Sequence, residues 1–293
     1  MTDAQLQALV AVADHGSFTG AARALGMTQS AVSHAITGLE QDLRVSLLNR
    51  SARGVRLTEV GQRTVEHARQ VLQLKETIRQ EADAARALGR GMLRVGSFGS
   101  SASRRLLPPL IDAFERRHPG ITVVVTEGTD PEVEQWIASG KVDVGFVTLP
   151  NEPFDTLQIV EDELLVLLHR THPLAGEARI RPEQLAGTTF VMPAAGCELL
   201  IGRVIPASKL DVRYHIRDIG TLVEMVARGA GVSIEPELAL PDVLPPEVVL
   251  RPLEPRVPRR VALAVRSRAA ASPACRAFLK IAAAQVRGAA AAA

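Results

Sequence analysis

The chain has 293 residues, a nearly balanced charge of +2 and two cysteines, and these properties exclude several classes of protein. Its length exceeds that of a typical single domain, and 46% apolar residues suffice for several buried cores. Cys197 and Cys275 are too few and too far apart for a secreted disulfide framework. Neither a signal-peptide pattern nor an apolar run of membrane-spanning length is present. We therefore expect a cytoplasmic protein of two or three domains with no membrane partner.

The first predicted helix-turn unit is marked by its caps. Ser17 is a favourable N-cap residue for a short helix over Phe18–Leu25, and Gly26 permits the tight turn that ends it. Ala21 and Ala22 are small, so a second helix can cross this one closely. We therefore expect two packed helices joined at Gly26.

The second helix begins after Thr28, which can cap it. At 100° per residue its apolar residues form one narrow stripe, which consists of Val32, Ile36, Leu39 and Leu43. The opposite side carries short hydrogen-bonding side chains, namely Ser30, Ser33, His34 and Thr37. Such a face can enter the DNA major groove, where Gln29 can pair with adenine. Periodicity alone also permits an ordinary small helical bundle with a polar outer face.

The residues around this helix favour DNA binding. The stretch GSFTGAARALGMTQSAVSHAITGLEQDL resembles the helix-turn-helix of LysR-type transcriptional regulators. The stretch LLNRSARGVRLTEVG, from Leu47 to Gly61, is similar to the wing and the start of the long linker helix in that family. The resemblance covers the whole chain in layout, with specific motifs up to Gly61. It implies a winged helix-turn-helix domain over residues 1–58 that binds double-stranded DNA.

The resemblance also implies which residues contact DNA. Matched by position to the recognition helix and the wing of the family, they are Thr28, Gln29, Ser30, Ser33, His34, Arg50 and Arg53. His34 stands where family members often have a longer Arg or Gln, and Arg44 replaces a usual glycine. No acidic residue lies between Leu43 and Thr58, so the arginines of this stretch form a local positive cluster suited to phosphates.

Residues 59–88 predict one long helix, which the stretch from Gly89 to Gly91 ends. Its apolar residues recur at three- and four-residue steps and form a seam of Ala68, Val71, Leu72, Leu74, Ile78, Ala82 and Ala85. This seam can pack against its own chain or against a second subunit. The resemblance implies the second: a linker and dimerisation helix over residues 59–90, homodimers that assemble into homotetramers, and a pseudo-palindromic operator.

From Leu93 onward, strand-like and helix-like segments alternate, which is typical of an α/β fold with parallel strands. We expect strands at residues 93–98, 121–127, 142–148, 157–169, 188–192, 212–217, 232–234 and 260–266. We expect helices at residues 104–117, 131–138, 222–228 and 273–286 and one after Gly196, with a frayed tail from Gly288 to Ala293.

Two successive α/β lobes with a late return to the first predict a hinged ligand-binding domain over residues 91–293. Lobe I is expected at about 91–160 plus 262–293, and lobe II at about 161–261. The fold class is thus α + α/β. The family resemblance implies a two-lobed effector-binding domain similar to periplasmic solute-binding proteins.

Polar residues cluster where predicted strands end and helices begin, which is where α/β domains bind ligands. The candidate effector-binding residues are Ser97, Ser100, Ser101, Thr129, Thr148, Cys197 and Asp218. Because helix N-termini favour anions, we expect a small anionic metabolite such as a carboxylate. Ser100 and Ser101 can equally serve as helix caps, and Thr129 can belong to a helix start.

Cys197 follows a glycine at an expected helix N-terminus, a setting that lowers the pKa of a thiol. Peroxide-sensing LysR-type proteins carry a reactive cysteine near this point, with a resolving cysteine shortly after it. Here Cys275 belongs to the last helix and no cysteine lies in between. The alternative is a small, unreactive side chain that lines the pocket.

Two other classes of function are weaker. An enzyme is not expected, because no nucleotide-binding glycine loop, nucleophile elbow or metal-ligand pattern is present, and we expect no cofactor and no metal. A stand-alone solute-binding protein fits only the C-terminal 200 residues or so, and the helix-turn-helix argues against it. We therefore expect a transcriptional regulator controlled by a small-molecule effector, with RNA polymerase as a further partner.

Overall fold

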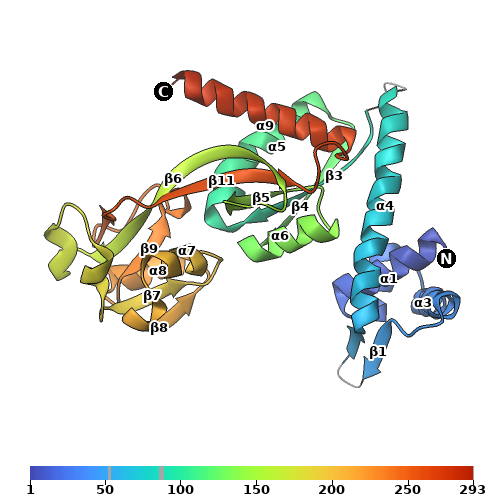
Figure 1. Ribbon diagram of the computed structural model, residues 1–293, viewed down its shortest axis with the longest axis horizontal. Coiled ribbons are helices and arrows are strands. Elements are labelled where there is room, and N and C mark those ends of the chain that lie inside the picture. Colours follow the sequence, from blue (N-terminus) through green and yellow to red (C-terminus); the bar gives the residue numbers. More distant parts are fainter. Residues whose placement is uncertain (52–53, 86–88, 293) are drawn as a thin grey trace. The chain divides into compact units, whose positions relative to one another are not determined.

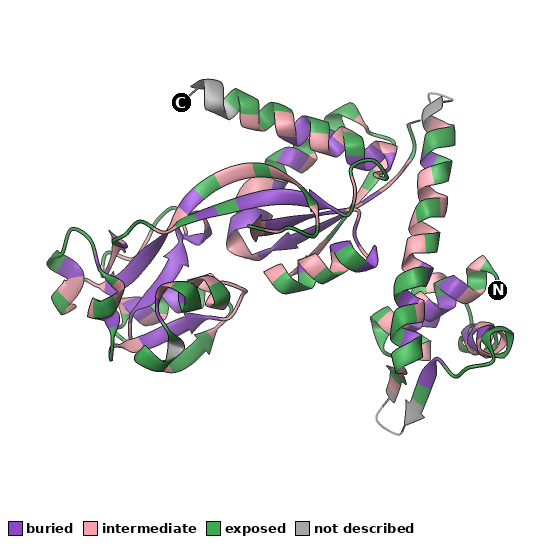
Figure 2. Cartoon of the chain, in the orientation of Figure 1, coloured by how far each residue is buried: buried purple, intermediate pink, exposed green. Residues whose placement is uncertain are grey.

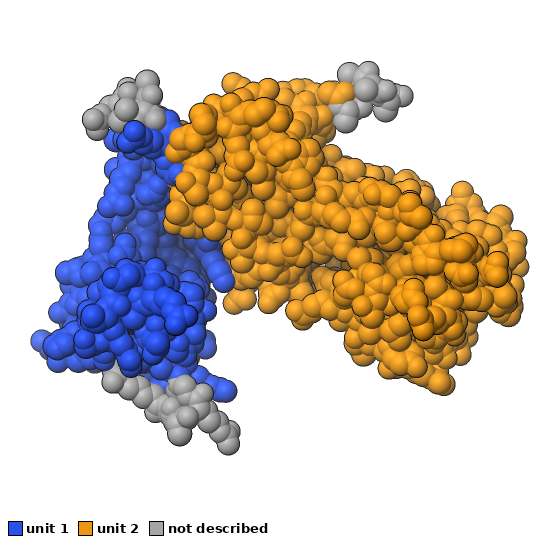
Figure 3. Space-filling view, turned by 180° about the vertical axis from the view of Figure 1, so that it is seen from behind, with its two compact units in different colours: residues 1–91, 138–141 blue, residues 92–137, 142–293 orange. Residues whose placement is uncertain are grey.

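The computed structural model describes residues 1–51, 54–85 and 89–292, which form two compact units (Figures 1 and 3). Unit 1 comprises Met1–Gly91 with Ala138–Lys141, and unit 2 comprises Met92–Ile137 with Val142–Ala293. Each unit buries its own apolar side chains (Figure 2). None of the helices in the described part of the chain is long and apolar enough to cross a membrane.

Unit 1 is a helical domain with a two-stranded hairpin and one long helix. Its elements are α1 (Asp3–His15), α2 (Phe18–Leu25), α3 (Gln29–Leu43), β1 (Leu48–Ser51), β2 (Gly54–Leu57) and α4 (Glu59–Ala85). The hairpin strands are antiparallel. The first three helices pack around a common core to which the start of α4 contributes Val65. This is a winged helix-turn-helix followed by a long helix.

The helix caps predicted from the sequence are confirmed. Ser17 Oγ accepts a hydrogen bond of 3.1 Å from Gly20 N, and Thr28 Oγ1 accepts one of 3.2 Å from Ala31 N. The apolar stripe of α3 is buried except at its end, where Leu43 is 40% exposed. Leu43 is exposed because α3 ends there and the next residue takes a left-handed conformation that turns the chain away.

The hairpin is fastened to α3 and α4 by two side chains. Glu40 Oε1, from α3, accepts hydrogen bonds from Leu47 N at 2.7 Å and Leu48 N at 3.2 Å. Thr58 Oγ1 donates to Ser46 O and accepts from Gly61 N, both at 2.9 Å. Thr58 therefore caps the start of α4 and ties it to the chain that leads into the hairpin.

Unit 2 alternates strands and helices. Its strands are β3 (Gly91–Phe98), β4 (Ile121–Gly128), β5 (Val144–Leu149), β6 (Asp155–His169), β7 (Thr189–Pro193), β8 (Asp211–Ile216), β9 (Ser233–Pro236), β10 (Val248–Pro252) and β11 (Pro258–Val265). Its helices are α5 (Leu107–Arg117), α6 (Asp130–Ser139), α7 (Glu198–Val204), α8 (Ile219–Ala227) and α9 (Pro273–Ala292), with short 3₁₀ turns between elements.

Two long strands connect the lobes of unit 2. The main sheet has the order β10-β6-β11-β5-β3-β4, with β9 also paired to β6. Strands β6 and β11 run antiparallel from one lobe to the other (Figure 1). Around β3 and β5 lies one core, flanked by α5 and α9; around β7 and the second half of β6 lie two more. The lobes therefore share a pair of strands as their connection.

The expectation of parallel strands is only partly right. Strand β3 is parallel to β5, and β7 is parallel to β8. Strand β11 is antiparallel to both β5 and β6, and β10 is antiparallel to β6. The sheet is mixed because the chain returns through both lobes after β9 and places β11 between β6 and β5.

Three helix boundaries also differ from the prediction by three residues or more, and one of them is the start of α8, at Ile219 rather than Leu222. Helix α5 begins at Leu107 rather than Arg104, and a π-helical segment, Gly99–Leu106, precedes it. The residues after Leu107 are Pro108 and Pro109, which have no N–H to donate to the preceding turn, so the α-helix starts with them. Helix α9 continues to Ala292 rather than ending at residue 286, because alanine favours helix.

Candidate nucleic-acid interface and ligand cavity

The N-terminal end of α3 presents the residues predicted to read DNA. Thr28, Gln29, Ser30 and His34 are exposed and Ser33 is half-buried. The Thr28 hydroxyl caps the helix and lies 3.0 Å from Ser30 Oγ. The Gln29 amide has a long contact of 3.5 Å with Thr19 Oγ1, so little holds it away from a ligand. This end of α3 is a row of accessible hydrogen-bonding groups.

The basic residues of the hairpin are only partly described. Arg50 belongs to β1, and its side chain and the whole of Arg53 lie outside the described residues. Arg44 and Arg56 are exposed on either side of them in the sequence. Arg44 adopts φ +54, which explains why this position suits a glycine.

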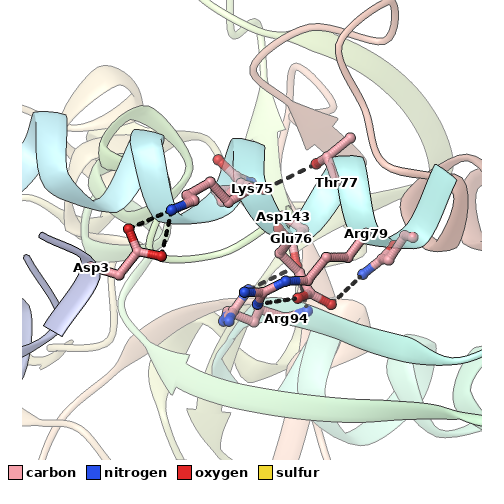
Figure 4. Close-up of polar contacts among 9 residues, drawn as sticks. Asp3, Lys75, Glu76, Thr77, Arg79, Arg94 and Asp143 are labelled. Atoms are coloured by element: carbon pink, nitrogen blue, oxygen red, sulfur yellow. Dashed lines mark hydrogen bonds and ion pairs between the residues drawn. The ribbon is translucent and has the colours of Figure 1, made fainter. Parts of the chain in front are cut away.

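Helix α4 is attached to α1 at two points. Lys75 pairs with Asp3 (Figure 4), and Arg69 pairs with Asp14 at 2.5 Å. Of the apolar seam, Ala68 is buried and Leu72 is half-buried, whereas the side chains of Val71, Leu74 and Ile78 are 43%, 60% and 61% exposed. The part of the chain that the structure describes therefore leaves these three side chains uncovered.

Unit 2 contains a cavity of about 480 Å³. Its walls come from the carboxyl ends of β3, β4, β7 and β8 and from residues of β9 and β11. The parallel pairs β3/β5 and β7/β8 belong to different lobes, so both lobes contribute to the wall. A volume of this size fits a small metabolite, and strand ends are the usual place for one.

Five predicted effector residues line this cavity: Ser100, Ser101, Thr129, Cys197 and Asp218. Asp218 caps α8, where its Oδ1 accepts from Thr221 N at 2.8 Å and from Thr221 Oγ1 at 2.9 Å. These hydrogen bonds hold the pKa of Asp218 below its usual value. Thr129 N and Oγ1 both donate to Glu132 Oε2, at 2.7 and 2.8 Å.

Two predicted effector residues do not line the cavity. Ser97 is fully buried, and its Oγ accepts a 2.9 Å hydrogen bond from Ser103 Oγ. Thr148 borders a separate, smaller cavity of about 110 Å³, where its N–H donates to Asp130 Oδ1 at 3.3 Å. Burial raises the pKa of Asp130 to about 6.

The cavity also contains a buried ion pair that the sequence analysis missed. Arg259 Nε and Nη2 donate to the two carboxylate oxygens of Asp162, each at 2.8 Å, and Nη1 donates to Ser101 Oγ at 3.2 Å. Asp162 Oδ2 accepts a further 3.0 Å hydrogen bond from Leu238 N. Asp162 lies on β6 and Arg259 on β11, and the sequence does not show that the register of these strands places the two residues opposite each other.

Glu127, Arg217 and Glu235 are further charged wall residues that were not predicted, and Glu235 is the buried one among them. Glu235 is the third residue of β9, is 3% exposed, and lines the cavity. Its Oε1 has no hydrogen-bond partner among the described residues. Burial raises the pKa of Glu235 to about 8, and the positive charge of Arg259 offsets only part of this effect. At neutral pH the carboxyl group therefore retains its proton.

The setting of Cys197 differs from the expected one. Burial raises the pKa of its thiol, and the neighbouring Glu235 raises it further, against an opposing effect of Arg259. Helix α7 is short, and no side-chain cap forms at its start. The expected lowering of the thiol pKa is thus wrong, and the geometry favours a pocket-lining cysteine over a reactive thiolate.

A winged helix-turn-helix joined to a two-lobed α/β domain with a polar cavity defines a class, the ligand-responsive DNA-binding proteins. Comparison with known families agrees. Residues 4–62 match the model for "Bacterial regulatory helix-turn-helix protein, lysR family", and residues 86–287 match the "LysR substrate binding domain". The chain belongs to the LysR family of bacterial transcriptional regulators.

Individual relatives span nearly the whole chain. It is 40% identical over 287 residues to the probable HTH-type transcriptional regulator LrrA of Synechococcus elongatus, covering 96% of each chain. It is 36% identical over 286 residues to the uncharacterized HTH-type transcriptional regulator YvbU of Bacillus subtilis, covering 96% of this chain and 98% of that one. A single-residue variant of full-length OxyR from Pseudomonas aeruginosa superposes with a TM-score of 0.74 at 27% identity over 98% of both chains.

These findings establish the general function. The chain is a DNA-binding transcriptional regulator whose activity is controlled by a small-molecule effector. The names of its relatives denote transcriptional regulators.

Proposed function

We propose that α3 reads an operator through its N-terminal end. Thr28, Gln29, Ser30, Ser33 and His34 contact base edges and nearby phosphates, and Arg50 and Arg53 contact the backbone from the wing. The observation that carries this proposal is the exposed row of short polar groups on α3, opposite the buried stripe. The base-contacting side chains are short, so α3 can approach the groove floor closely.

The assembly unit is a homodimer formed through α4. Three uncovered apolar residues at helical spacing, Val71, Leu74 and Ile78, support this, because such a row costs free energy while it faces water. A two-fold dimer presents two copies of α3 and requires a pseudo-palindromic operator. Dimers join further into homotetramers, as the family resemblance implies.

The effector binds in the 480 Å³ cavity, with Ser100, Ser101, Thr129, Cys197 and Asp218 on its wall. Ser97 and Thr148 support neighbouring elements and act on the ligand indirectly. Because both lobes supply wall residues, a ligand that contacts both favours a more closed arrangement of the lobes. Such a change alters the spacing of the DNA-reading heads in the assembly.

The organisation follows from these roles. Residues 1–58 bind DNA, residues 59–90 link and dimerise, and residues 91–293 bind the effector. The chain acts on RNA polymerase by contact and catalyses no reaction itself, and its DNA target places it in the bacterial cytoplasm.

A footprint tests the proposal directly. The full-length protein is incubated with genomic fragments selected by binding, including the DNA upstream of its own gene, at moderate salt. We expect protection of two half-sites related by two-fold symmetry, because a dimer presents α3 twice. Fragments of scrambled sequence serve as the control. Equal protection of selected and scrambled DNA would contradict the proposed readout by α3.

A further inference from the structure

Glu235 is the polar group of the cavity that the fold leaves unsatisfied. A buried carboxyl group without a hydrogen bond costs free energy, and it persists where a ligand completes it. Its Oε1 lacks a partner among the described residues, and its side chain lines the cavity. The wall therefore carries a carboxyl oxygen without a partner, which a donor group of a ligand can complete once the carboxyl group loses its proton.

Glu235 has charged neighbours of both signs, and the adjacent Cys197 thiol has more acidic neighbours than basic ones. Glu198, at the start of α7, raises the pKa of Glu235, and Arg259, on β11, lowers it. The adjacent Cys197 thiol experiences Glu235, Asp130 and Glu198 as acidic neighbours and Arg259 as its basic neighbour. This part of the cavity is therefore acidic.

The positive charge of Arg259 is already engaged. Two of its nitrogens donate to Asp162 in a bidentate pair that is buried on both sides. A bidentate carboxylate neutralises the guanidinium and leaves little net charge for an anion. The wall has one more arginine, Arg217, which is exposed and shares the outer part of the cavity with the exposed acids Glu127 and Asp218. In the buried part that the structure describes, a second negative group beside Glu235 would meet acidic neighbours and an arginine that already pairs with Asp162.

We propose that the effector carries a protonated amino group, which binds at Glu235 and donates a hydrogen bond to its Oε1. This inference rests on the proposed role of the cavity as the effector site. It changes the expectation from a purely anionic metabolite to an ammonium-bearing one. A carboxylate elsewhere on the ligand remains compatible, near Ser100 and Ser101, so both amino acids and simple amines satisfy the chemistry.

Binding releases a proton. In the free protein the Glu235 carboxyl is protonated at neutral pH, and the ammonium ligand replaces that proton: the carboxyl O–H gives H⁺ to solvent, and the carboxylate pairs with the ligand N–H. Since the pKa of Glu235 is about 8, affinity rises with pH up to that value. The expected slope is about tenfold per pH unit between roughly pH 6.5 and 7.5.

Thermal unfolding and calorimetry of the full-length protein test this. The probes are the twenty common amino acids, putrescine and methylammonium chloride, against succinate, acetate and sodium chloride. We expect stabilisation by at least one ammonium compound and none by the anions. Binding of an amino acid but not of putrescine or methylammonium would show that the ligand also needs a carboxylate. Binding of these amines would show that the ammonium group suffices. For the compound that binds, we expect tighter binding at about pH 7.5 than at about pH 6.5 and release of about one proton.

Variants assign the effect to one carboxyl group. Glu235→Gln keeps the shape and removes the charge, and Glu235→Met provides an apolar replacement if the amide disturbs folding. Both are expected to weaken binding at least about tenfold at about pH 7.5 and to abolish its pH dependence. Glu237→Gln, at an exposed position two residues later that does not line the cavity, is expected to behave as wild type.

Three results would overturn the inference: stabilisation by the anions alone, an unchanged pH slope in both Glu235 variants, or no stabilisation by any ammonium probe. The footprint on selected DNA is measured on the same preparations. A selective footprint without ammonium binding rejects this inference and leaves the regulator intact. Ammonium binding without a selective footprint rejects the proposed DNA readout instead.

Discussion

Gln29 carries an amide that can contact a base edge with two hydrogen bonds. It is exposed at the N-terminal end of α3 and held only by a 3.5 Å contact with Thr19. We expect Gln29→Ala to reduce discrimination at one base pair of each half-site by about 1–3 kcal/mol, because a bidentate amide–adenine pair is lost. The affinities of the variant for the operator and for its single-base-pair variants measure this.

The same helix offers a matched control. Gln41 is also an exposed glutamine of α3, near its C-terminal end. Gln41→Ala should leave the base preference as it is in the wild type. If both variants lose the same affinity at every base pair, Gln29 supports the helix or contacts phosphate and does not read sequence.

The contacts that the sequence predicted join residues close to one another along the chain. Ser17 and Thr28 cap helices through bonds to backbone three residues ahead, so a short stretch of sequence contains the whole interaction. Asp162 and Arg259 are 97 residues apart and meet only through the register of β6 and β11. Glu235 interrupts a largely apolar stretch, and this interruption was the one available signal that its carboxyl group has a role. An ion pair between residues on two strands can be identified only when the register of those strands is known.

The junction between the hairpin and α4 depends on one glycine. A Cβ atom at Gly61 would lie 2.0 Å from Leu47 O, and that carbonyl accepts a 2.9 Å hydrogen bond from Thr58 N. Leu47 O and the backbone of Gly61 cannot move apart without disturbing Thr58, which bonds to Leu47 through its N–H and caps α4 through its side chain. We expect Gly61→Ala to lower the free energy of unfolding by about 1–3 kcal/mol, measured by urea denaturation.

A second glycine separates this effect from helix propensity. A Cβ atom at Gly202, inside α7, would meet nothing within 4 Å. Gly202→Ala should be neutral or slightly stabilising, since alanine favours helix. Equal stability of the Gly61→Ala protein and the wild type would mean that the junction opens readily and that the close contact is not required.

At the level of elements, the spacing of apolar residues predicted which helices and strands form better than it predicted where they begin and end. The α3 stripe of Val32, Ile36 and Leu39 is fully buried, as its spacing indicated. The start of α5 was predicted three residues too early. Its two prolines lack the N–H that would continue a preceding turn, and the spacing of apolar residues does not reveal this effect. Strand β10 was not predicted, since its short sequence ends in proline and is held by pairing with β6.

At the scale of the whole molecule, the described residues leave Val71, Leu74 and Ile78 of the α4 seam exposed. Leu74 and Ile78 are one helical turn apart and more than half exposed. Their burial by a second chain removes apolar surface from water, which is the main favourable contribution to association. The same contact joins two DNA-reading heads, so assembly and operator affinity are coupled.

Leu74→Glu combined with Ile78→Glu tests this coupling. The two acids place like charges on the seam at adjacent turns, so we expect the dimer to dissociate in sedimentation or light-scattering measurements. Loss of the second head should lower operator affinity by about 10²–10⁴, because the half-sites are then bound independently. Circular dichroism should be unchanged, since both side chains are exposed in the single chain.

Val243→Glu is the matched control, because Val243 is an 85% exposed apolar residue of unit 2 and not part of α4. It should keep both the oligomeric state and the operator affinity. A Leu74/Ile78 variant that remains dimeric would move the interface elsewhere, and the exposed valines of β4, Val124 and Val125 on an edge strand of the sheet, would be the next candidates. A monomeric variant with full operator affinity would instead contradict the coupling between dimer formation and operator affinity, since each head would then bind its half-site without help from the other.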